Sequence, residues 1–522
     1  MTRAGGRPTK PFWLLLLLFS WLLFSAQIAA ALQQAQQSPQ GQQAAPAKPP
    51  DTAAPESKIT PRQAEELFRS VDEILAFVSK DTGLPIKDKV KRKLANRDEV
   101  EQYIVRHMQE DKDTQRLERS AASLKKLGLL PRDFELRPFL LSLLKEQVAG
   151  FYDAKTKTVF LLDWVDADAQ RPVLAHELTH ALQDQSYNLS QWTEESRHAK
   201  TDEEELALEE AQSAREAVIE GQAMLVLLDY MLAPSGKSVA DSPAIVDAMK
   251  GAMVDGGQTP MFGKAPLFLR EALTFPYTFG LDFERQVLAK KGRDAAFKGV
   301  FDKPPRDTRQ VMEPDTYLMG EHIPELVVPK LDAVLKGEYK RYDFGGLGQF
   351  DVTMLLWQWY GKQTGAQLPQ AWRGGYYFTY EKNGHPGAPY VLVSLTRWAT
   401  EAAAKEFASL YAGSLVRRYR SVAEVKPSQD GSGEWKTEEG PVEISASGPF
   451  VIAIEGLAGD ERTQVRQAMH RARTMVCVLC SLSVDMASVG QFFSHRRHQM
   501  HFCMSHTTRP RLFCGMSAFS YG

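Results

Sequence analysis

The sequence predicts an α+β fold that is mainly helical with a small antiparallel sheet, followed by a smaller α+β region. Apolar residues recur at helical spacing in several long segments, which indicates amphipathic helices. Two β-rich runs around a polar turn, within residues 148–163, predict a hairpin. Residues 391–395 and 451–454 are typical of strands, and residues 402–415 are typical of a helix.

Length and composition set broad limits on what the chain can be. Its 522 residues suffice for two or three domains of ordinary size. Hydrophobic residues make up 43% and charged residues 25%, which is ordinary globular usage. The formal net charge of −2 gives no indication of a nucleic-acid partner, and we expect none.

The N-terminus, residues 1–31, has the pattern of a signal peptide. A basic start precedes the apolar residues 12–24, and three alanines at 29–31 fit a cleavage site. The apolar run is shorter than the roughly 20 residues of a membrane span, so cleavage is favoured over an uncleaved anchor. We therefore expect a secreted or periplasmic protein, with membrane attachment only if the segment stays uncleaved.

Composition divides the rest of the chain. Residues 32–58 are rich in Gln, Ala and Pro and predict a disordered linker. Folded structure is expected from about Ile59, because Thr60-Pro61 fits a helix N-cap followed by proline. We expect one domain over residues 59–330 and an α+β accessory region over residues 331–461.

Residues 462–522 form an atypical tail. This segment contains no lysine or glutamate, but it holds all four cysteines of the chain and five histidines. One interpretation is a metal-binding tail, yet the spacing matches no zinc module. The favoured interpretation is a disordered or erroneous C-terminus. The cysteines and the histidines considered as ligands are Cys477, Cys480, Cys503, Cys514, His495, His498 and His501.

A helical pair of histidines is the strongest chemical signal. His176 and His180 are spaced i, i+4, so on a helix both imidazoles lie on one face. Two imidazoles from one rigid element are what a zinc site needs, together with a third ligand and an open position for water. Glu177 follows the first histidine, beside the same face, where it can act as a general base.

The surrounding helix supports this interpretation. At about 100° per residue the histidines, Glu177 and Asp184 cluster on one side, and Leu174, Leu178, Ala181 and Leu182 on the other. Asp184 lies two turns beyond His176, too far along a straight helix to share one metal. We expect it to orient an imidazole instead.

The third ligand is expected downstream, at Glu220. This carboxylate lies in an otherwise apolar helix, where it is costly unless it is paired or metal-bound. Gly221 beside it would let another helix approach. Glu216, one turn earlier, is the rival ligand or a supporting residue. The acidic residues 202–210 are expected to form a solvated face.

These residues resemble those of the gluzincin metallopeptidases. A closer resemblance is to a group of exported bacterial proteins predicted to be metallopeptidases. The shared segments are HELTHALQDQ at 176–185, EGxA at 220–223, FPYxxG at 275–280 and a PPxxTxQ…P…Y segment at 304–317. One departure is Glu313, where the group is expected to have histidine before the proline.

The resemblance implies a zincin-like catalytic domain that binds Zn²⁺ through His176, His180 and Glu220, with Glu177 as the catalytic base. The hairpin would lie beside the site helix, and its edge strand could pair with a substrate. Tyr277, Tyr317 and His322 are candidates for contacting the oxyanion, and the sequence does not rank them.

The function expected from sequence is therefore a secreted zinc metallopeptidase that hydrolyses peptide bonds of a peptide or protein substrate through a metal-activated water. The alternatives are an inactive zincin-fold binding protein and a zinc amidase acting on cell-wall peptides. Retention of Glu177 favours an active enzyme over the inactive form. The sequence gives no indication of the oligomeric state.

Overall fold

A computed structural model describes residues 59–488, except 111, 148–149, 195–198, 257–259, 364–366 and 427–429. The described residues up to Thr474 belong to one compact unit, and the rest of α19 belongs to a second. The expected signal peptide and linker lie outside the described residues, as do Cys503, Cys514 and the three tail histidines at 495–501.

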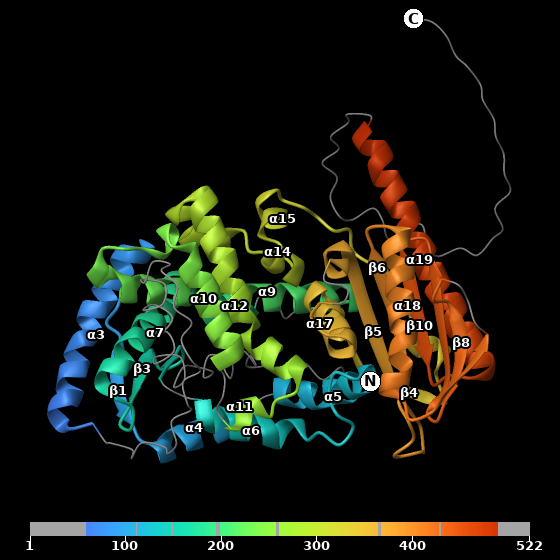
Figure 1. The fold of residues 1–522 in the computed structure, drawn as a ribbon, viewed down its shortest axis with the longest axis horizontal. Helices are drawn as coiled ribbons and strands as arrows, with labels where there is room; N and C mark the ends of the chain where they lie inside the picture. Colours follow the sequence, from blue (N-terminus) through green and yellow to red (C-terminus); the bar gives the residue numbers. More distant parts are fainter. Residues whose placement is uncertain are drawn as a thin grey trace, which may run out of the picture. The chain divides into compact units, whose positions relative to one another are not determined.

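The first part of the compact unit is mostly helical and carries a three-stranded sheet (Figure 1). Its elements are α3 (Pro61–Thr82), β1 (Lys91–Ala95), α4 (Arg97–Glu110), α5 (Lys112–Leu127), α6 (Leu136–Gln147), β2 (Phe151–Asp153), β3 (Thr158–Leu162), α7 (Ala167–Tyr187), α8 (Leu189–Glu194), α9 (Asp202–Leu232), η2 (Ala233–Ser235), η3 (Val239–Asp241), α10 (Pro243–Gly256), α11 (Pro260–Gly263), α12 (Leu267–Lys291), η4 (Ala295–Gly299), α13 (Val300–Asp302), α14 (Thr308–Met312), α15 (Pro314–Leu318) and α16 (Leu331–Val334).

The second part is built on a seven-stranded antiparallel sheet of order β4-β5-β6-β10-β9-β8-β7. Its elements are β4 (Tyr339–Gly346), α17 (Gln349–Tyr360), η5 (Leu368–Ala371), β5 (Trp372–Lys382), β6 (Val391–Trp398), α18 (Glu401–Arg418), β7 (Val422–Lys426), β8 (Gly433–Thr437), β9 (Gly440–Ser447), β10 (Phe450–Glu455) and α19 (Gly459–Ser488). The α+β prediction is confirmed, including the strands at 391–395 and 451–454 and the helix at 402–415.

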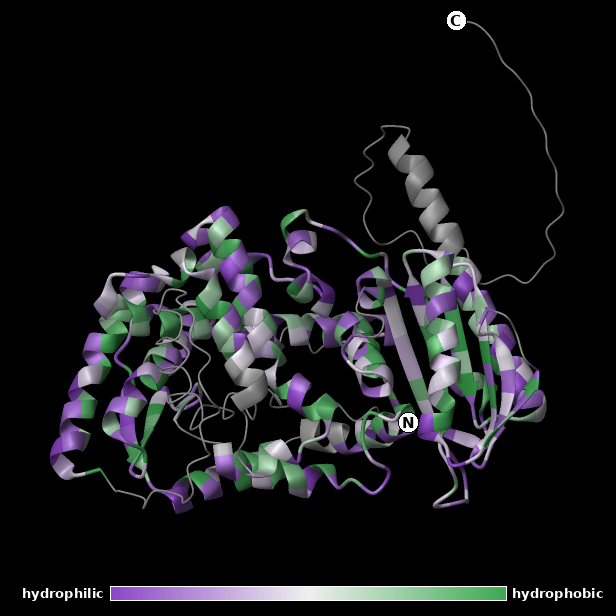
Figure 2. Ribbon diagram, viewed as in Figure 1, coloured by the Kyte–Doolittle hydropathy of each residue, from purple (hydrophilic) through white to green (hydrophobic). Residues whose placement is uncertain are grey.

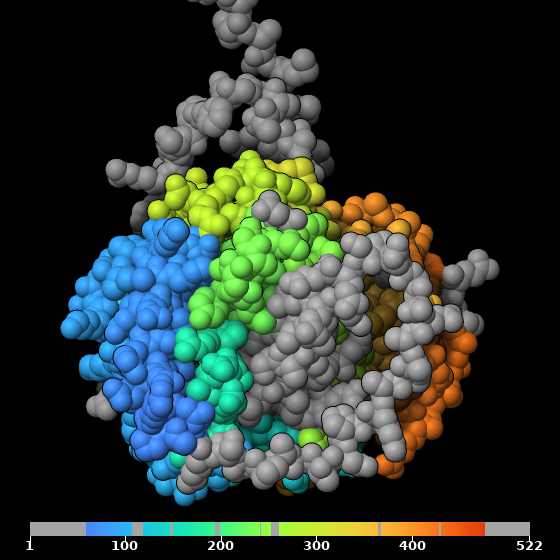
Figure 3. Space-filling model, turned by 60° about the vertical axis from the view of Figure 1, so that its left-hand side comes forward, coloured from blue at the N-terminus to red at the C-terminus, as the bar shows by residue number. Residues whose placement is uncertain are grey.

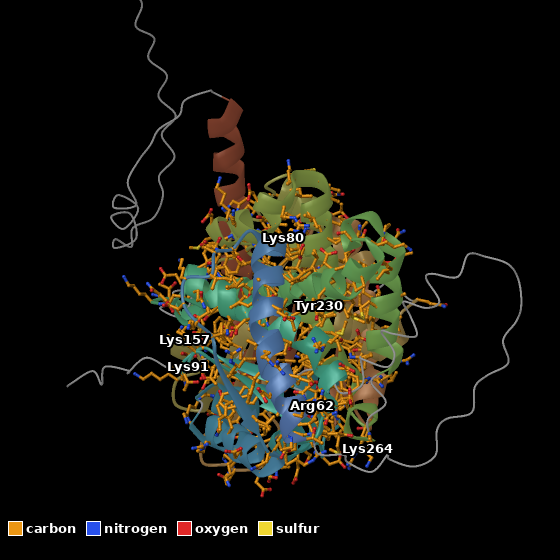
Figure 4. The ribbon with its side chains drawn as sticks, turned by 90° about the vertical axis from the view of Figure 1, so that its left-hand side faces the viewer. Arg62, Lys80, Lys91, Lys157, Tyr230 and Lys264 are labelled. Atoms are coloured by element: carbon orange, nitrogen blue, oxygen red, sulfur yellow. The ribbon has the colours of Figure 1, made fainter. Side chains whose placement is uncertain are left out.

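Helix α3 begins where the sequence predicts. Thr60 caps it, and Gln63 completes a capping box with Pro61 in the first turn. Its apolar side packs on α7 and the end of α9, where the rings of Phe77 and Tyr230 lie 5.3 Å apart. Figure 4 shows Tyr230 beside this helix, and the space-filling view in Figure 3 shows its surface in blue.

The predicted hairpin is present as β2 and β3, but the small sheet is not purely antiparallel. Strand β1 pairs with β3 in parallel, giving the order β1-β3-β2. Lys91 donates its backbone N–H to Lys157 at 3.0 Å, and Figure 4 shows these two lysines next to each other. Strand β1 was not predicted, because its first three residues are exposed and basic and show no apolar alternation.

Three helices, α7, α9 and α12, form the centre of the helical part, where α12 crosses α9 (Figure 1). By length and composition the described segment Asp202–Ser235 could cross a membrane, but 78% of its apolar window is buried inside the protein. Its apolar character is thus explained by burial on several sides, because α7, α12 and α3 pack against it.

The acidic run at the start of α9 is not a solvated face, contrary to expectation. Asp202 binds Arg341 through both carboxylate oxygens, at 3.0 and 2.9 Å. Glu209 accepts the backbone N–H of Gly346 at 2.7 Å, and Glu210 accepts the backbone and hydroxyl of Thr308. Carboxylates about two turns apart thus join α9 to β4 and α14, an arrangement that a single sequence does not reveal.

Every residue of β6 and β10 is buried, and Figure 2 shows hydrophobic residues in strands beside α18. The predicted bounds of 331–461 stay a prediction, although the sheet falls within them. The tail was expected to be disordered from residue 462, but helix α19 continues to Ser488. Val465 and Met469 are fully buried there, and Arg466 pairs with Glu443 at 3.1 Å, which accounts for the ordered helix.

A buried ion pair holds α18 on the large sheet. Arg418 binds both oxygens of Glu455 at 2.8 Å, and the hydroxyls of Tyr411 and Tyr419 donate to the same carboxylate. Burial raises the pKa of Glu455, but the charges of Arg418 and Lys126 lower it by more than burial raises it, so the carboxylate stays ionised.

We predict that Glu455→Gln lowers the free energy of unfolding by about 3 kcal/mol, because it leaves the Arg418 guanidinium buried without a counter-charge. Urea denaturation followed by circular dichroism measures this change. Glu66→Gln, which removes an exposed ion pair with Arg62, serves as the control and should leave the midpoint unchanged. Equal effects of the two substitutions would contradict the role given to the buried pair.

Candidate metal centre

Helix α7 positions the two histidines. Asp166 caps it by accepting the backbone N–H groups of Asp168 and Ala169, so the helix starts at Ala167. As the i, i+4 spacing requires, the Nε2 atoms of His176 and His180 lie 3.1 Å apart. Both side chains are almost completely buried, and they point toward α9.

Helix α9 supplies the third group. The Oε2 atom of Glu220 lies 3.2 Å from Nε2 of His176 and 3.5 Å from Nε2 of His180. The possible ligand atoms of these three residues lie within 4.8 Å of one another, which forms a buried group that could hold a metal ion. The three residues that the sequence predicts as ligands are therefore brought together.

A close crossing of two helices places Glu220. A Cβ atom on Gly221 would lie 2.3 Å from the backbone carbonyl of Gly280 on α12. A Cβ atom on Gly280 would lie 2.2 Å from the carbonyl oxygen of Ala217. Real Cβ atoms do not approach so closely, so both positions require glycine for the helices to pack as they do. The EGxA and FPYxxG segments meet at this crossing.

Glu177 points toward the hairpin side of the site. Its Oε2 accepts the backbone N–H of Tyr152 in β2 at 2.8 Å. Its Oε1 is buried and has no hydrogen-bond partner among the described residues. Burial raises the pKa of Glu177 to about 8, and Glu220 acts in the same direction, whereas His180 and the Tyr152 N–H oppose it. A carboxyl group with this pKa can both accept and donate a proton near neutral pH.

Two glutamine side chains, which were not predicted from the sequence, orient His180 through a series of hydrogen bonds. Nδ1 of His180 lies 2.9 Å from Oε1 of Gln183, which can accept its proton and leave Nε2 free to bind a metal. Gln183 in turn donates to the carbonyl of Ile219 and to Gln222, at 3.1 and 2.9 Å. Gln222 donates to the carbonyl of Ala296 at 2.6 Å. The only sequence signal was the position of Gln183 three residues after the histidine.

Asp184 does not orient an imidazole as expected. It accepts the Tyr152 hydroxyl at 2.9 Å and the backbone N–H of Leu189 at 3.2 Å, and it pairs with Lys157. Its side chain turns away from the histidines because the hairpin and α8 supply these partners. Asp184 thus fastens the hairpin to the site helix, and Tyr152 contacts both Asp184 and Glu177.

Among the three candidate oxyanion residues, only Tyr277 contacts the metal-centre group. Its ring stacks on His176, with the ring centroids 6.3 Å apart. Burial raises the pKa of Tyr277 well above 10, with Glu220 adding to the shift, so the hydroxyl stays protonated. The hydroxyl of Tyr317 donates to the carbonyl of Lys303, and His322 lies beside Arg306.

Two other carboxylates named from sequence lie outside the group. Glu216 is one turn from Glu220, and burial raises its pKa to about 8, with Glu220 adding to the shift. It supplies no ligand atom to the cluster of three. Glu313 stands where the group that the sequence resembles is expected to have histidine. Its Oε1 lies 3.3 Å from the Nε2 of Gln349 on α17. In this structure its side chain contributes to helix packing.

The three ligand candidates shift one another's pKa values. Burial raises the pKa of Glu220, but His180 and His176 lower it to about 2. Burial lowers the pKa of His180, but Glu220 outweighs this and raises it to about 9. Burial lowers the pKa of His176. A buried carboxylate therefore lies beside two imidazoles that keep it charged, and this arrangement suits a bound cation.

The donor set fits zinc. Two imidazole nitrogens and one carboxylate oxygen, with further positions open to water, are ligands of catalytic zinc sites. The orphaned Oε1 of Glu177 supports the fit, because a buried carboxylate oxygen without a partner needs a water or another group beside it. His176, His180 and Glu220 would hold the ion.

Comparison with known proteins gives a family match outside this site. Residues 339–466 match a family described as a domain of unknown function, DUF8575. No curated protein matches the chain. A crystal structure from Chloroflexus aurantiacus, described as "a putative hydrolase with a novel fold", is similar with a TM-score of 0.34 and 18% identity; the similarity covers 57% of this chain and 99% of that chain. The family match covers the large sheet, which does not carry the three ligand candidates.

We predict that the metal-free protein loses stability as the pH rises from about 6 to about 9. The folded-state pKa values of Glu177, about 8, and His180, about 9, both lie above their ordinary values of 4.5 and 6.5. Each group therefore stabilises the fold at low pH and loses this contribution as the pH passes its folded pKa. Melting temperatures in the presence of a chelator measure the trend.

Glu177→Gln should make this decline shallower, because the amide does not titrate. Glu66→Gln, at an exposed position, should keep the slope of the unsubstituted protein. A melting temperature that stays constant or rises over this pH range would contradict the charge states assigned to the site.

Proposed function

We propose that this protein is a zinc-dependent metallopeptidase of gluzincin type. One observation carries the proposal: a buried His176, His180 and Glu220 group lies next to a carboxylate, Glu177, that is positioned as a base. Such an arrangement costs stability in the metal-free chain, since it gathers four ionisable groups away from water. Groups of this kind are concentrated at functional sites.

In this mechanism a zinc ion held by the three residues would lower the pKa of a bound water and polarise the scissile carbonyl. Glu177 takes a proton from the attacking water as the new C–O bond forms. It then gives a proton to the amine as the C–N bond breaks. The elevated pKa of Glu177, about 8, suits both transfers near neutral pH.

The hairpin supports a peptide as the substrate. Strand β2 lies at the edge of the small sheet, and its Tyr152 N–H is directed at Glu177 rather than at β3. An extended chain could pair with this edge and so place its carbonyl carbon near Glu177. We propose a peptide or protein substrate on this ground, together with export through the N-terminal segment predicted from sequence.

The first test is metal content together with activity. The full chain should bind about one Zn²⁺, and His176→Ala or Glu220→Gln should remove most of it. Glu177→Gln should keep the metal but lose about 10²–10⁴ in rate, the usual contribution of a general base. Zinc is measured by elemental analysis, and hydrolysis by mass spectrometry of a mixed peptide library.

Glu216→Gln is the matched control for Glu220→Gln, because it removes a buried carboxylate one helical turn away and should keep the zinc. Circular dichroism shows whether each variant is folded. A zinc-free folded protein, or full activity of Glu177→Gln, would refute the proposal. Bound zinc without hydrolysis of any peptide would favour the inactive binding protein, and cleavage of cell-wall peptides alone would favour the amidase.

The second test concerns Tyr277, which we propose stabilises the oxyanion that forms on the substrate carbonyl. Tyr277→Phe keeps the ring on His176 and removes only the hydroxyl. It should lower kcat by about 10²–10³, leave KM nearly unchanged and retain the zinc. Tyr317→Phe, whose hydroxyl donates to Lys303, is the control and should keep normal kcat. Equal kcat values for the two variants would exclude this role.

A further inference from the structure

A second pocket lies away from the metal centre, where the helical part meets the large sheet. Its volume is about 780 Å³, and none of the metal-centre residues lines it. The walls come from the end of α5, the start of β4, the turn between β5 and β6, and Glu439 between β8 and β9. Pockets between separate parts of a fold are common ligand sites.

Positive charge predominates in this pocket, where five basic side chains face three carboxylates. Lys340 pairs with Glu381 at 3.4 Å. Lys125 and Lys382 have no carboxylate partner within the range that the structure describes. The charged residues that line the pocket are Lys125, Lys126, Arg132, Lys340, Lys382, Glu118, Glu381 and Glu439.

The inner wall of the pocket is fixed by a buried cation. The side chain of Lys126 is only 1% exposed, and its Nζ lies 2.7 Å from Glu439 and over the ring of Tyr419. Arg132 binds the other oxygen of Glu439 at 2.8 Å. The single carboxylate of Glu439 therefore pairs with two cations, so the local charge stays positive even with Glu439 in place.

The opposite wall carries two aromatic rings, tilted by 40° from each other. The rings of Tyr342 and Tyr390 lie 4.7 Å apart and line the pocket together. The turn between β5 and β6 reaches Tyr390 through Gly384 and Gly387, both in the left-handed region at φ of +71° and +85°. Asn383 donates hydrogen bonds to the backbone carbonyls of Glu338 and Gly337, just before β4. These bonds anchor the turn, so the pocket has a defined rim.

We propose that this pocket binds an anionic ligand that carries a carboxylate or a phosphate on a flat body. The oxyanion is held by Lys125 and Lys382, with Arg132 adding charge, while the body lies against Tyr342 and Tyr390. The two ammonium groups, which have no carboxylate partner among the described residues, account for the preference for an anion, and the tyrosine pair accounts for the preference for a flat body. Nothing in this proposal depends on the chemistry at the metal centre.

The test titrates the full chain with phenyl phosphate, phenylacetate and the neutral 2-phenylethanol by isothermal calorimetry. At least one of the two anions should bind and raise the melting temperature, and the stronger of them identifies the preferred oxyanion. The neutral probe should bind much more weakly. The double substitution K125Q/K382Q should weaken binding of the anion about tenfold or more, because both lysines are expected to contact it.

The matched control is K80Q/K264Q, which removes two exposed lysines on another face of the molecule (Figure 4) and should leave binding unchanged. Glu177→Gln should also bind the anion normally, which separates this result from the test of the peptidase. The proposal is overturned if neither anion binds at millimolar concentration, if the neutral probe binds equally well, or if both double variants bind like the unsubstituted protein.

Discussion

The close crossing of α9 and α12 is the constraint on which the metal centre depends. Gly221 and Gly280 let the two backbones come nearer than any side chain would allow. Glu220 is the residue directly before this crossing, so the same contact that packs the helices sets the position of its carboxylate. Tyr277 lies one turn before Gly280 on α12, and its ring stacks on His176. Packing of two helices therefore delivers two functional groups to histidines on a third.

Burial gives these groups their chemistry. Burial raises the pKa of both carboxylates and brings that of Glu177 to about 8, whereas at Glu220 the two neighbouring histidines outweigh burial and lower the pKa to about 2. The two carboxylates thus separate into a charged ligand and a titratable base. Gln183 and Gln222 keep His180 oriented, and Tyr152 connects the base to the edge of the hairpin. Each contact comes from an element that is itself buried, which limits how far the site can relax.

Local patterns predicted more of this structure than long-range ones. The capped start at Thr60, the hairpin and the i, i+4 histidines depend on short spacings, and all three were confirmed as structure. Glu220 was predicted because a carboxylate in an apolar helix needs a partner. The partners of Asp184, the contacts of the acidic run and the parallel strand β1 were missed, since each depends on a segment far away in the chain. Periodicity shows which face of an element is buried but not which distant residue lies opposite it.

The most direct test of the central claim is X-ray absorption spectroscopy of the zinc-loaded full chain. The account predicts a first coordination sphere of two imidazole nitrogens with oxygen from Glu220 and water, at about 2.0–2.2 Å and without sulfur. Scattering from sulfur at about 2.3 Å would place the zinc on the cysteines of the C-terminal tail instead. That result would contradict the assignment of His176, His180 and Glu220 as the metal centre.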